Sequence, residues 1–120
     1  MMGMIIGIGS RRGVTSDEVS AAIESALRDA GIGITDVRIF ASSRLKENEA
    51  GINEAVRSLG REIVFLDDET INAYKPPSAS EANRFGLVGV AEPSALALSD
   101  EKEMVLEKKG YGRVTIAIAR

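Results

Sequence analysis

The sequence predicts an α/β protein: a three-layer α/β/α sandwich with a mostly parallel sheet and a C-terminal antiparallel hairpin. Short apolar runs at residues 4–9, 37–41 and 62–66 alternate with stretches that carry apolar residues at helical spacing. This alternation is typical of βα units. The last two apolar runs, residues 104–106 and 114–119, have no helical stretch between them, which indicates a hairpin.

The first unit consists of a strand, a glycine turn and a helix. The continuous apolar run at residues 4–9 favours a strand that is buried on both faces. Thr15 and Glu18 have the spacing of a capping box, and apolar residues then follow at helical spacing as far as Ala30. Gly31 stands where a helix-ending glycine is expected, so a helix should end there.

The next helices are predicted from their caps and stops. Asn48 is expected to cap a second helix, which ends at Gly60. Asp67 or Asp68 is expected to cap a single helical turn that runs through Ile71. Two prolines at residues 76–77 then terminate that turn.

Two further short helices and the hairpin complete the prediction. Ser78 and Glu81 form a second capping box, whose helix Gly86 closes, and Pro93 starts a helix that covers residues 95–98. The hairpin turn is predicted at residues 109–112. In the final strand, residues 115, 117 and 119 are small enough for a helix to lie close to that face.

The 120 residues suit a single domain, residues 1–120, and their composition excludes several kinds of site. With no cysteine and no histidine, the chain offers neither a thiolate nor an imidazole. Acid–base chemistry must therefore use Asp, Glu, Lys, Tyr, a bound metal or the substrate. The net charge of −3 argues against nucleic-acid binding. No apolar run is long enough to cross a membrane and no signal peptide is indicated, so we expect a cytoplasmic protein.

The first candidate site is the turn after the first strand, which ligands favour in open α/β sheets. Arg11 and Arg12 can pair with carboxylates or phosphates through two hydrogen bonds each, and nearby helix N–H groups favour an anion. The alternative is that the glycines only permit close packing and the arginines are solvated. The third glycine is one residue too late for a dinucleotide fingerprint. The candidate binding residues are Gly7, Gly9, Ser10, Arg11, Arg12 and Gly13.

A second candidate follows the second strand, where Lys46 and Glu49 stand near Ser42 and Ser43. The carboxyl ends of parallel strands share one edge, so these residues can face the same crevice. The alternative is a surface loop whose acid favours a helix N-terminus.

Two more candidates lie further along the chain. Capping explains the spacing of Ser78, Ser80 and Glu81, although a capped N-terminus can also present N–H groups to a ligand. Glu92 is an isolated acid in an apolar run. It is either a semi-buried carboxylate with a raised pKa, suited to acid–base work, or a helix-start acid that faces water.

Taken in order, these segments resemble the family formed by the C-terminal domain of the cobalamin-biosynthesis protein CbiG and its single-domain relative CobE. The resemblance covers nearly the whole chain. In one departure, Ser10 stands where other members often carry cysteine; in another, these 120 residues do not include an N-terminal CbiG domain. The segments that carry the resemblance are residues 7–13, 45–51, 78–81, 89–96 and 115–119.

The resemblance implies a role in corrin biosynthesis, because full-length CbiG is similar to a cobalt-precorrin-5A hydrolase, which opens a δ-lactone and releases acetaldehyde. The substrate would be a cobalt-precorrin, a tetrapyrrole fringed with carboxylates that Arg11, Arg12 and the loop amides would grip, and Lys46 would add a contact. The substrate would carry the cobalt, and the protein would bind no cofactor or metal of its own. Implied candidates for activating water are Glu49, Glu81 and Glu92.

Three interpretations stay open. The first is a hydrolase subunit, completed by a separate CbiG N-terminal chain or another pathway enzyme. The second is a non-catalytic tetrapyrrole-binding or accessory domain. The third is a small phosphate- or nucleotide-binding α/β protein. A homodimer is a further expectation, and neither nucleic acid nor a membrane is an expected partner.

Overall fold

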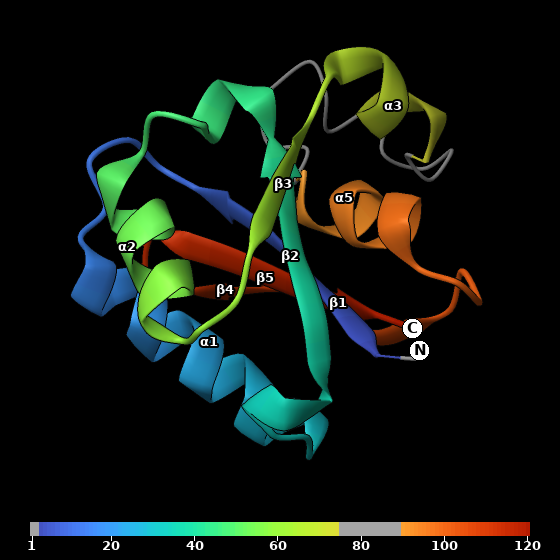
Figure 1. The fold of residues 1–120 in the computed structure, drawn as a ribbon, viewed down its shortest axis with the longest axis horizontal. Coiled ribbons are helices and arrows are strands. Elements are labelled where there is room, and N and C mark those ends of the chain that lie inside the picture. The colour runs from blue at the N-terminus through green and yellow to red at the C-terminus, as the bar shows by residue number, and fades with distance from the viewer. Residues whose placement is uncertain (1–2, 75–89) are drawn as a thin grey trace.

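The computed structural model describes residues 3–74 and 90–120, and in them the chain forms a five-stranded sheet with helices on both faces (Figure 1). The strand order is β3-β2-β1-β5-β4. Strands β1, β2 and β3 are parallel, whereas β5 is antiparallel to both β1 and β4. The elements are β1 (Met4–Ser10), α1 (Ser16–Ala30), β2 (Val37–Ser43), α2 (Ala50–Ser58), β3 (Ile63–Leu66), α3 (Asp68–Ala73), α5 (Ala91–Leu98), β4 (Met104–Tyr111) and β5 (Val114–Ala119), with 3-10 turns η1 (Ile34–Asp36) and η2 (Arg44–Lys46).

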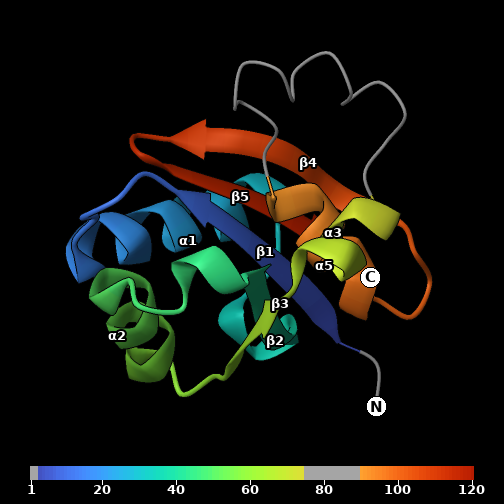
Figure 2. The same ribbon diagram turned by 90° about the horizontal axis from the view of Figure 1, so that it is seen from above.

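The predicted three-layer arrangement is confirmed. Figure 2 shows α1 and α2 on one side of the sheet and α3 and α5 on the other. Val114, Ile116 and Ile118 are fully buried in the core beneath α1 and α2. Ala119 packs with Ala95 of α5 in a second cluster on the opposite face, as the small residues of this strand predicted. The sheet is therefore covered on both faces, and binding groups are confined to its edges and loops.

The caps of the first and third helices follow the prediction. Thr15 accepts a hydrogen bond from the N–H of Glu18, the Glu18 carboxylate accepts one from the N–H of Thr15, and Gly31 ends α1 with a φ of 70°. Asp67 caps α3 by accepting a hydrogen bond from the N–H of Thr70 at 2.8 Å. Helix α3 continues to Ala73, beyond the predicted single turn.

Two local predictions are wrong. The N-cap of α2 is Glu49 rather than Asn48, and the Asn53 amide donates to the carbonyls of Glu47 and Glu49 just before the helix. The hairpin turn falls two residues later than expected, so that Tyr111 pairs with Val114. The reason is that Gly112 supplies the left-handed φ of 65° required by the turn, while Gly110 remains in the strand opposite Thr115.

Helix α5 confirms the helix predicted around Pro93 but begins earlier, at Ala91, and it lies close against β1. A Cβ atom on Gly7 would stand 1.9 Å from the carbonyl oxygen of Ala91, so only glycine permits this separation between strand and helix. At Gly9 the nearest atom, Val90 Cγ2, is 3.5 Å away, an ordinary contact. Close packing thus requires glycine at position 7, whereas it does not require glycine at position 9. The capping box predicted from Ser78 and Glu81, with Gly86, lies outside the described residues.

Candidate functional site

The loop that follows β1 lies at the carboxyl edge of the sheet and is held from two sides. On one side, the N–H of Arg11 donates to the carbonyl of Arg113 at 3.0 Å, and the Arg113 guanidinium donates to the carbonyl of Gly13 at 3.3 Å. Arg113 belongs to the turn between β4 and β5. The hairpin, which lies about a hundred residues further along the chain, therefore braces this loop.

Helix α2 holds the same loop from the other side (Figure 1). The N–H of Gly13 donates to Oε1 of Glu49 at 3.1 Å, so the first two candidate segments do meet. Close behind it, a Cβ atom on Gly51 would lie 2.2 Å from the carbonyl oxygen of Val14. The start of α2 thus packs directly on the loop, and Gly13 adopts a left-handed φ of 76° there.

Arg11 and Arg12 are exposed at the tip of this loop. In the part of the chain that the structure describes, neither guanidinium forms an ion pair or a side-chain hydrogen bond. Each is therefore available to bind a carboxylate or phosphate through two N–H groups. Lys46, in η2 after β2, is half-buried.

The main-chain amides of the loop are less available than the sequence suggests. The N–H groups of Arg11, Gly13 and Thr15 donate to protein oxygens, and the N–H of Glu18 donates to Oγ1 of Thr15. The loop uses these donors to fix its own shape, so its amides do not form an uninterrupted run that is free for an anion. An anion here would rely on the arginine side chains and on those amides that make no such bond.

Serines line the strand ends beside the loop. The buried Ser42 hydroxyl donates to the carbonyl of Ile8 at 2.6 Å, which ties β2 to β1, and Ser43 accepts a hydrogen bond from the N–H of Leu45. The Ser10 hydroxyl is buried and has no hydrogen-bond partner among the residues that the structure describes. Burying an unsatisfied hydroxyl is costly, so Ser10 is suited to an additional contact here.

The candidate carboxylates are not gathered at one point. Glu49 contacts Gly13, whereas Glu92 accepts a hydrogen bond from the N–H of Lys108 at 3.0 Å and so is held against β4. These two residues stand at the starts of helices on opposite faces of the sheet. Glu81, Ser78 and Ser80 lie outside the described residues.

Sequence reasoning missed the ion pair between Arg113 and Glu18. Nε of Arg113 donates to Oε2 of Glu18 at 2.8 Å, and a second N–H bond reaches Oε1. The hydrogen bonds from Arg113 and from the N–H of Thr15 lower the pKa of Glu18 to about 2. Bonding to Glu18 likewise raises the pKa of Arg113 above its usual value. No local pattern predicts this pair, because the two residues are 95 positions apart.

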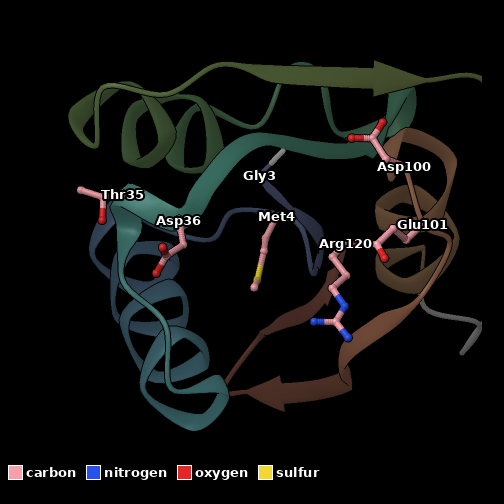
Figure 3. Close-up of a pocket in the computed structure, with 7 residues that line it drawn as sticks. All are labelled: Gly3, Met4, Thr35, Asp36, Asp100, Glu101 and Arg120. Atoms are coloured by element: carbon pink, nitrogen blue, oxygen red, sulfur yellow. The ribbon is translucent and has the colours of Figure 1, made fainter. Parts of the chain in front are cut away.

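A separate hollow of about 290 Å³ lies at the opposite, amino-terminal edge of the sheet (Figure 3). Figure 3 shows Asp36 on one side of Met4, and Arg120, Glu101 and Asp100 on the other. A second hollow, of about 410 Å³, runs between α1 and the hairpin and includes Glu18, Tyr111 and Arg113. The first hollow is remote from Arg11 and Arg12, and its carboxylates repel an anion, so we place the candidate site at the loop instead.

Neither a membrane-spanning helix nor an acidic metal site is present in the described residues. No helix among them is long and apolar enough to span a bilayer. Nor do residues 3–74 and 90–120 bring three acidic side chains together in a way that could hold a metal ion.

Comparison with known proteins places this geometry in a family. Residues 4–119 match the family model described as cobalamin synthesis G C-terminus. The chain is 30% identical to a cobalt-precorrin-5A hydrolase of Priestia megaterium over 97% of this chain and 32% of the relative. It is 31% identical to the protein CobE of a Sinorhizobium species, over 98% of this chain and 79% of that protein.

A solved structure agrees with the sequence relatives. The crystal structure of CobE, a protein from the cobalamin biosynthetic pathway, superposes with a TM-score of 0.83 at 30% identity and covers 98% of this chain and 89% of CobE. The chain spans about a third of the length of the hydrolase relative and most of the length of CobE. It therefore belongs to the CbiG C-terminal family of cobalamin-biosynthesis proteins.

Proposed function

We propose that this chain binds a cobalt-precorrin and acts as the C-terminal half of a cobalt-precorrin-5A hydrolase, in which a δ-lactone is opened and acetaldehyde is released. One observation carries the proposal: Arg11 and Arg12 project, free of protein partners in the described residues, from a braced loop at the carboxyl edge of the sheet. The relatives support the reaction class, since one of them is named a cobalt-precorrin-5A hydrolase.

The chemistry of the ligand fits these side chains. A cobalt-precorrin carries acetate and propionate groups around its rim, and a guanidinium binds a carboxylate through two parallel N–H bonds. The cobalt arrives as part of the substrate, and we propose no metal or cofactor held by the chain itself. Lys46, which follows β2 at the neighbouring strand end, would add a further polar contact.

For activation of water we propose Glu49 over Glu92. Glu49 contacts the loop that bears the arginines, and its Oε1 holds the Gly13 amide while Oε2 accepts no hydrogen bond from the described residues. Glu92 is held against β4 by the N–H of Lys108. Glu81 stays a candidate from the sequence alone.

Because the chain spans about a third of the length of the hydrolase relative, we also propose that a further portion completes the enzyme. The remaining two thirds of that relative would correspond to a CbiG N-terminal portion, supplied by the same or a separate polypeptide. The likeness to CobE, which this chain matches over most of its length, favours a second candidate: a non-catalytic tetrapyrrole-binding domain.

Binding is tested by absorbance titration with cobalt uroporphyrin, a cobalt tetrapyrrole with eight carboxylates. The Arg11→Ala/Arg12→Ala variant should bind about 10- to 30-fold more weakly, because exposed ion pairs contribute up to about 1 kcal/mol each. The matched control is Arg28→Ala/Arg57→Ala, which removes the same charge from exposed positions on α1 and α2. Equal affinity in the two variants would overturn the arginine contact. Tight nucleotide binding without any spectral shift would instead favour a phosphate-binding protein.

Catalysis is tested by acetaldehyde release from cobalt-precorrin-5A. Release by this chain alone, or only after an N-terminal CbiG portion is added, would support the hydrolase and separate a complete enzyme from a split one. Loss of release in Glu49→Gln, with substrate binding retained, would support Glu49 as the base. Absence of release under both conditions, together with tight tetrapyrrole binding, would favour the carrier.

A further inference from the structure

The ion pair between Arg113 and Glu18 connects three parts of the molecule that meet at the arginine loop. The Arg113 carbonyl accepts the Arg11 N–H at 3.0 Å, and its guanidinium donates to the carbonyl of Gly13 at 3.3 Å. The same guanidinium binds both carboxylate oxygens of Glu18. Glu18 in turn accepts the N–H of Thr15 at the start of α1. The loop is thus tied at both ends, to the hairpin and to the first helix.

The geometry points to a positioning role rather than to a stabilising one. The side chains of Arg113 and Glu18 are 44% and 34% exposed, and ion pairs at such exposure contribute little to the free energy of unfolding. Their planar, two-bond contact does, however, restrict direction strongly. A pair that adds little stability but fixes the shape of the arginine loop acts chiefly on where Arg11 and Arg12 point.

We infer that the Arg113–Glu18 pair positions the loop so that Arg11 and Arg12 project together toward a polycarboxylate, an inference that rests on the proposed function. Neither member of the pair touches the ligand in this arrangement, because both are occupied by each other and by the loop. The pair lowers the cost of binding by keeping the loop in its binding-competent shape before the ligand arrives.

Glu18→Gln provides a test in which two explanations predict opposite changes in the affinity for a polycarboxylate. If Glu18 acts only through its charge, removing a negative group near the loop should strengthen binding of a polycarboxylate. If Glu18 positions the loop, binding should weaken. Glutamine also preserves the capping box, because it can accept the same N–H bond at this position, so α1 should remain capped. Glu24→Gln removes the same charge from an exposed position of the same helix and serves as the matched control.

The expected result for Glu18→Gln is a dissociation constant for cobalt uroporphyrin about 3- to 10-fold above that of Glu24→Gln, because apparent affinity falls with the fraction of loops in the competent shape. The Gly13 amide signal in a nitrogen-15 NMR spectrum should broaden or shift in Glu18→Gln and not in Glu24→Gln. Arg113→Lys, which keeps the charge but loses the two-bond contact, should weaken binding without changing its salt dependence.

Binding by Glu18→Gln that equals or exceeds that of Glu24→Gln would overturn the inference. If Arg11→Ala/Arg12→Ala still weakened binding in that case, the proposed function would stand without it. Conversely, weak binding by Glu18→Gln together with unchanged binding by the double variant would overturn the arginine contact, and with it the inference that the pair positions these two arginines. In the double variant, the salt dependence of tetrapyrrole binding is expected to fall, because two contacts between charges are lost. If it fell equally in Arg113→Lys, Arg113 would contact the ligand directly, and this result would also overturn the inference.

Discussion

Gly7→Ala should destabilise the fold more than its small size suggests. The added Cβ would lie 1.9 Å from the carbonyl oxygen of Ala91, 2.8 Å from its carbonyl carbon and 3.0 Å from the amide nitrogen of Ala95. All three are backbone atoms of α5, so no side-chain rotation can relieve the overlap. Ordinary contact begins at 3.4 Å, and α5 must therefore move by about 1.5 Å from β1.

The magnitude follows from what that movement disturbs. Helix α5 packs with Ala91, Pro93 and Ala95 fully or nearly fully buried. Overpacking a tight contact of this kind costs typically ~1–3 kcal/mol, and the rigid backbone on both sides puts Gly7→Ala near the upper end of this range. For a chain of this size, a loss of about 3 kcal/mol corresponds to a fall in Tm of roughly 10 °C.

The assay is urea unfolding followed by circular dichroism at helical wavelengths, with Gly9→Ala as the matched control. The nearest atoms to a Cβ at Gly9 stand at 3.5, 3.8 and 3.9 Å, so that alanine fits. Its lower chain entropy in the unfolded state should make Gly9→Ala neutral or stabilising by up to ~1 kcal/mol. Equal midpoints for the two variants would refute the close approach of α5 to β1.

Two further predictions concern the braced loop and its surroundings. Gly51 lies in the first turn of α2, where alanine would ordinarily favour the helix by up to about 1 kcal/mol. A Cβ at this position, however, would lie 2.2 Å from the carbonyl oxygen of Val14, so we expect Gly51→Ala to lose ~1–3 kcal/mol of stability in urea unfolding. Any gain in stability would contradict the packing of α2 on the loop. The stability profile with pH should fall at both ends. Because the pKa of Glu18 is lowered from 4.5 to about 2, its contribution, which is small for a pair this exposed, is full above pH 4.5 and is lost as the pH falls toward 2. Because burial and Asp29 raise the pKa of Tyr111 from 10.0 to about 12, the native state keeps that proton longer, and stability is lost as the pH rises from 10 to 12. The plot of Tm against pH should become flatter at acidic pH in Glu18→Gln but not in Glu24→Gln. It should become flatter at alkaline pH in Tyr111→Phe. Profiles that match the unmodified protein would show that Glu18 and Tyr111 do not cause the loss of stability.

Sequence patterns predicted the first unit of the fold well because its signals are local. The capping box of Thr15 and Glu18 and the glycine at position 31 act within one helix and appear in the structure as expected. The alternation of large and small residues along residues 114–119 also predicted which face α5 covers. The predicted ends of helices and strands were less accurate where more than one residue can form the turn or the cap. Either of two glycines can close the hairpin, and Asn48 and Glu49 compete to begin α2.

The candidate site was only partly predictable. The position of the arginine loop follows from chain order, because ligands bind where parallel strands end. The contact of Glu49 with Gly13 and that of Glu92 with Lys108 depend on how the helices pack, and the sequence offered both acids on equal terms. The use of the loop amides by the protein itself could not be read from glycine spacing.

Local patterns in the sequence are enough to predict the order of the five strands and of the described α-helices along the chain, their buried faces, and two adjacent arginines after the first strand. These features depend on residues within about one helical turn or one strand of each other, where periodicity and capping act. The pairing of β5 with β1, and the contacts of Arg113 with Glu18 and the loop, follow instead from tertiary packing. Such contacts join residues about a hundred positions apart, and they form because both faces of the sheet must be covered while its strands stay in register.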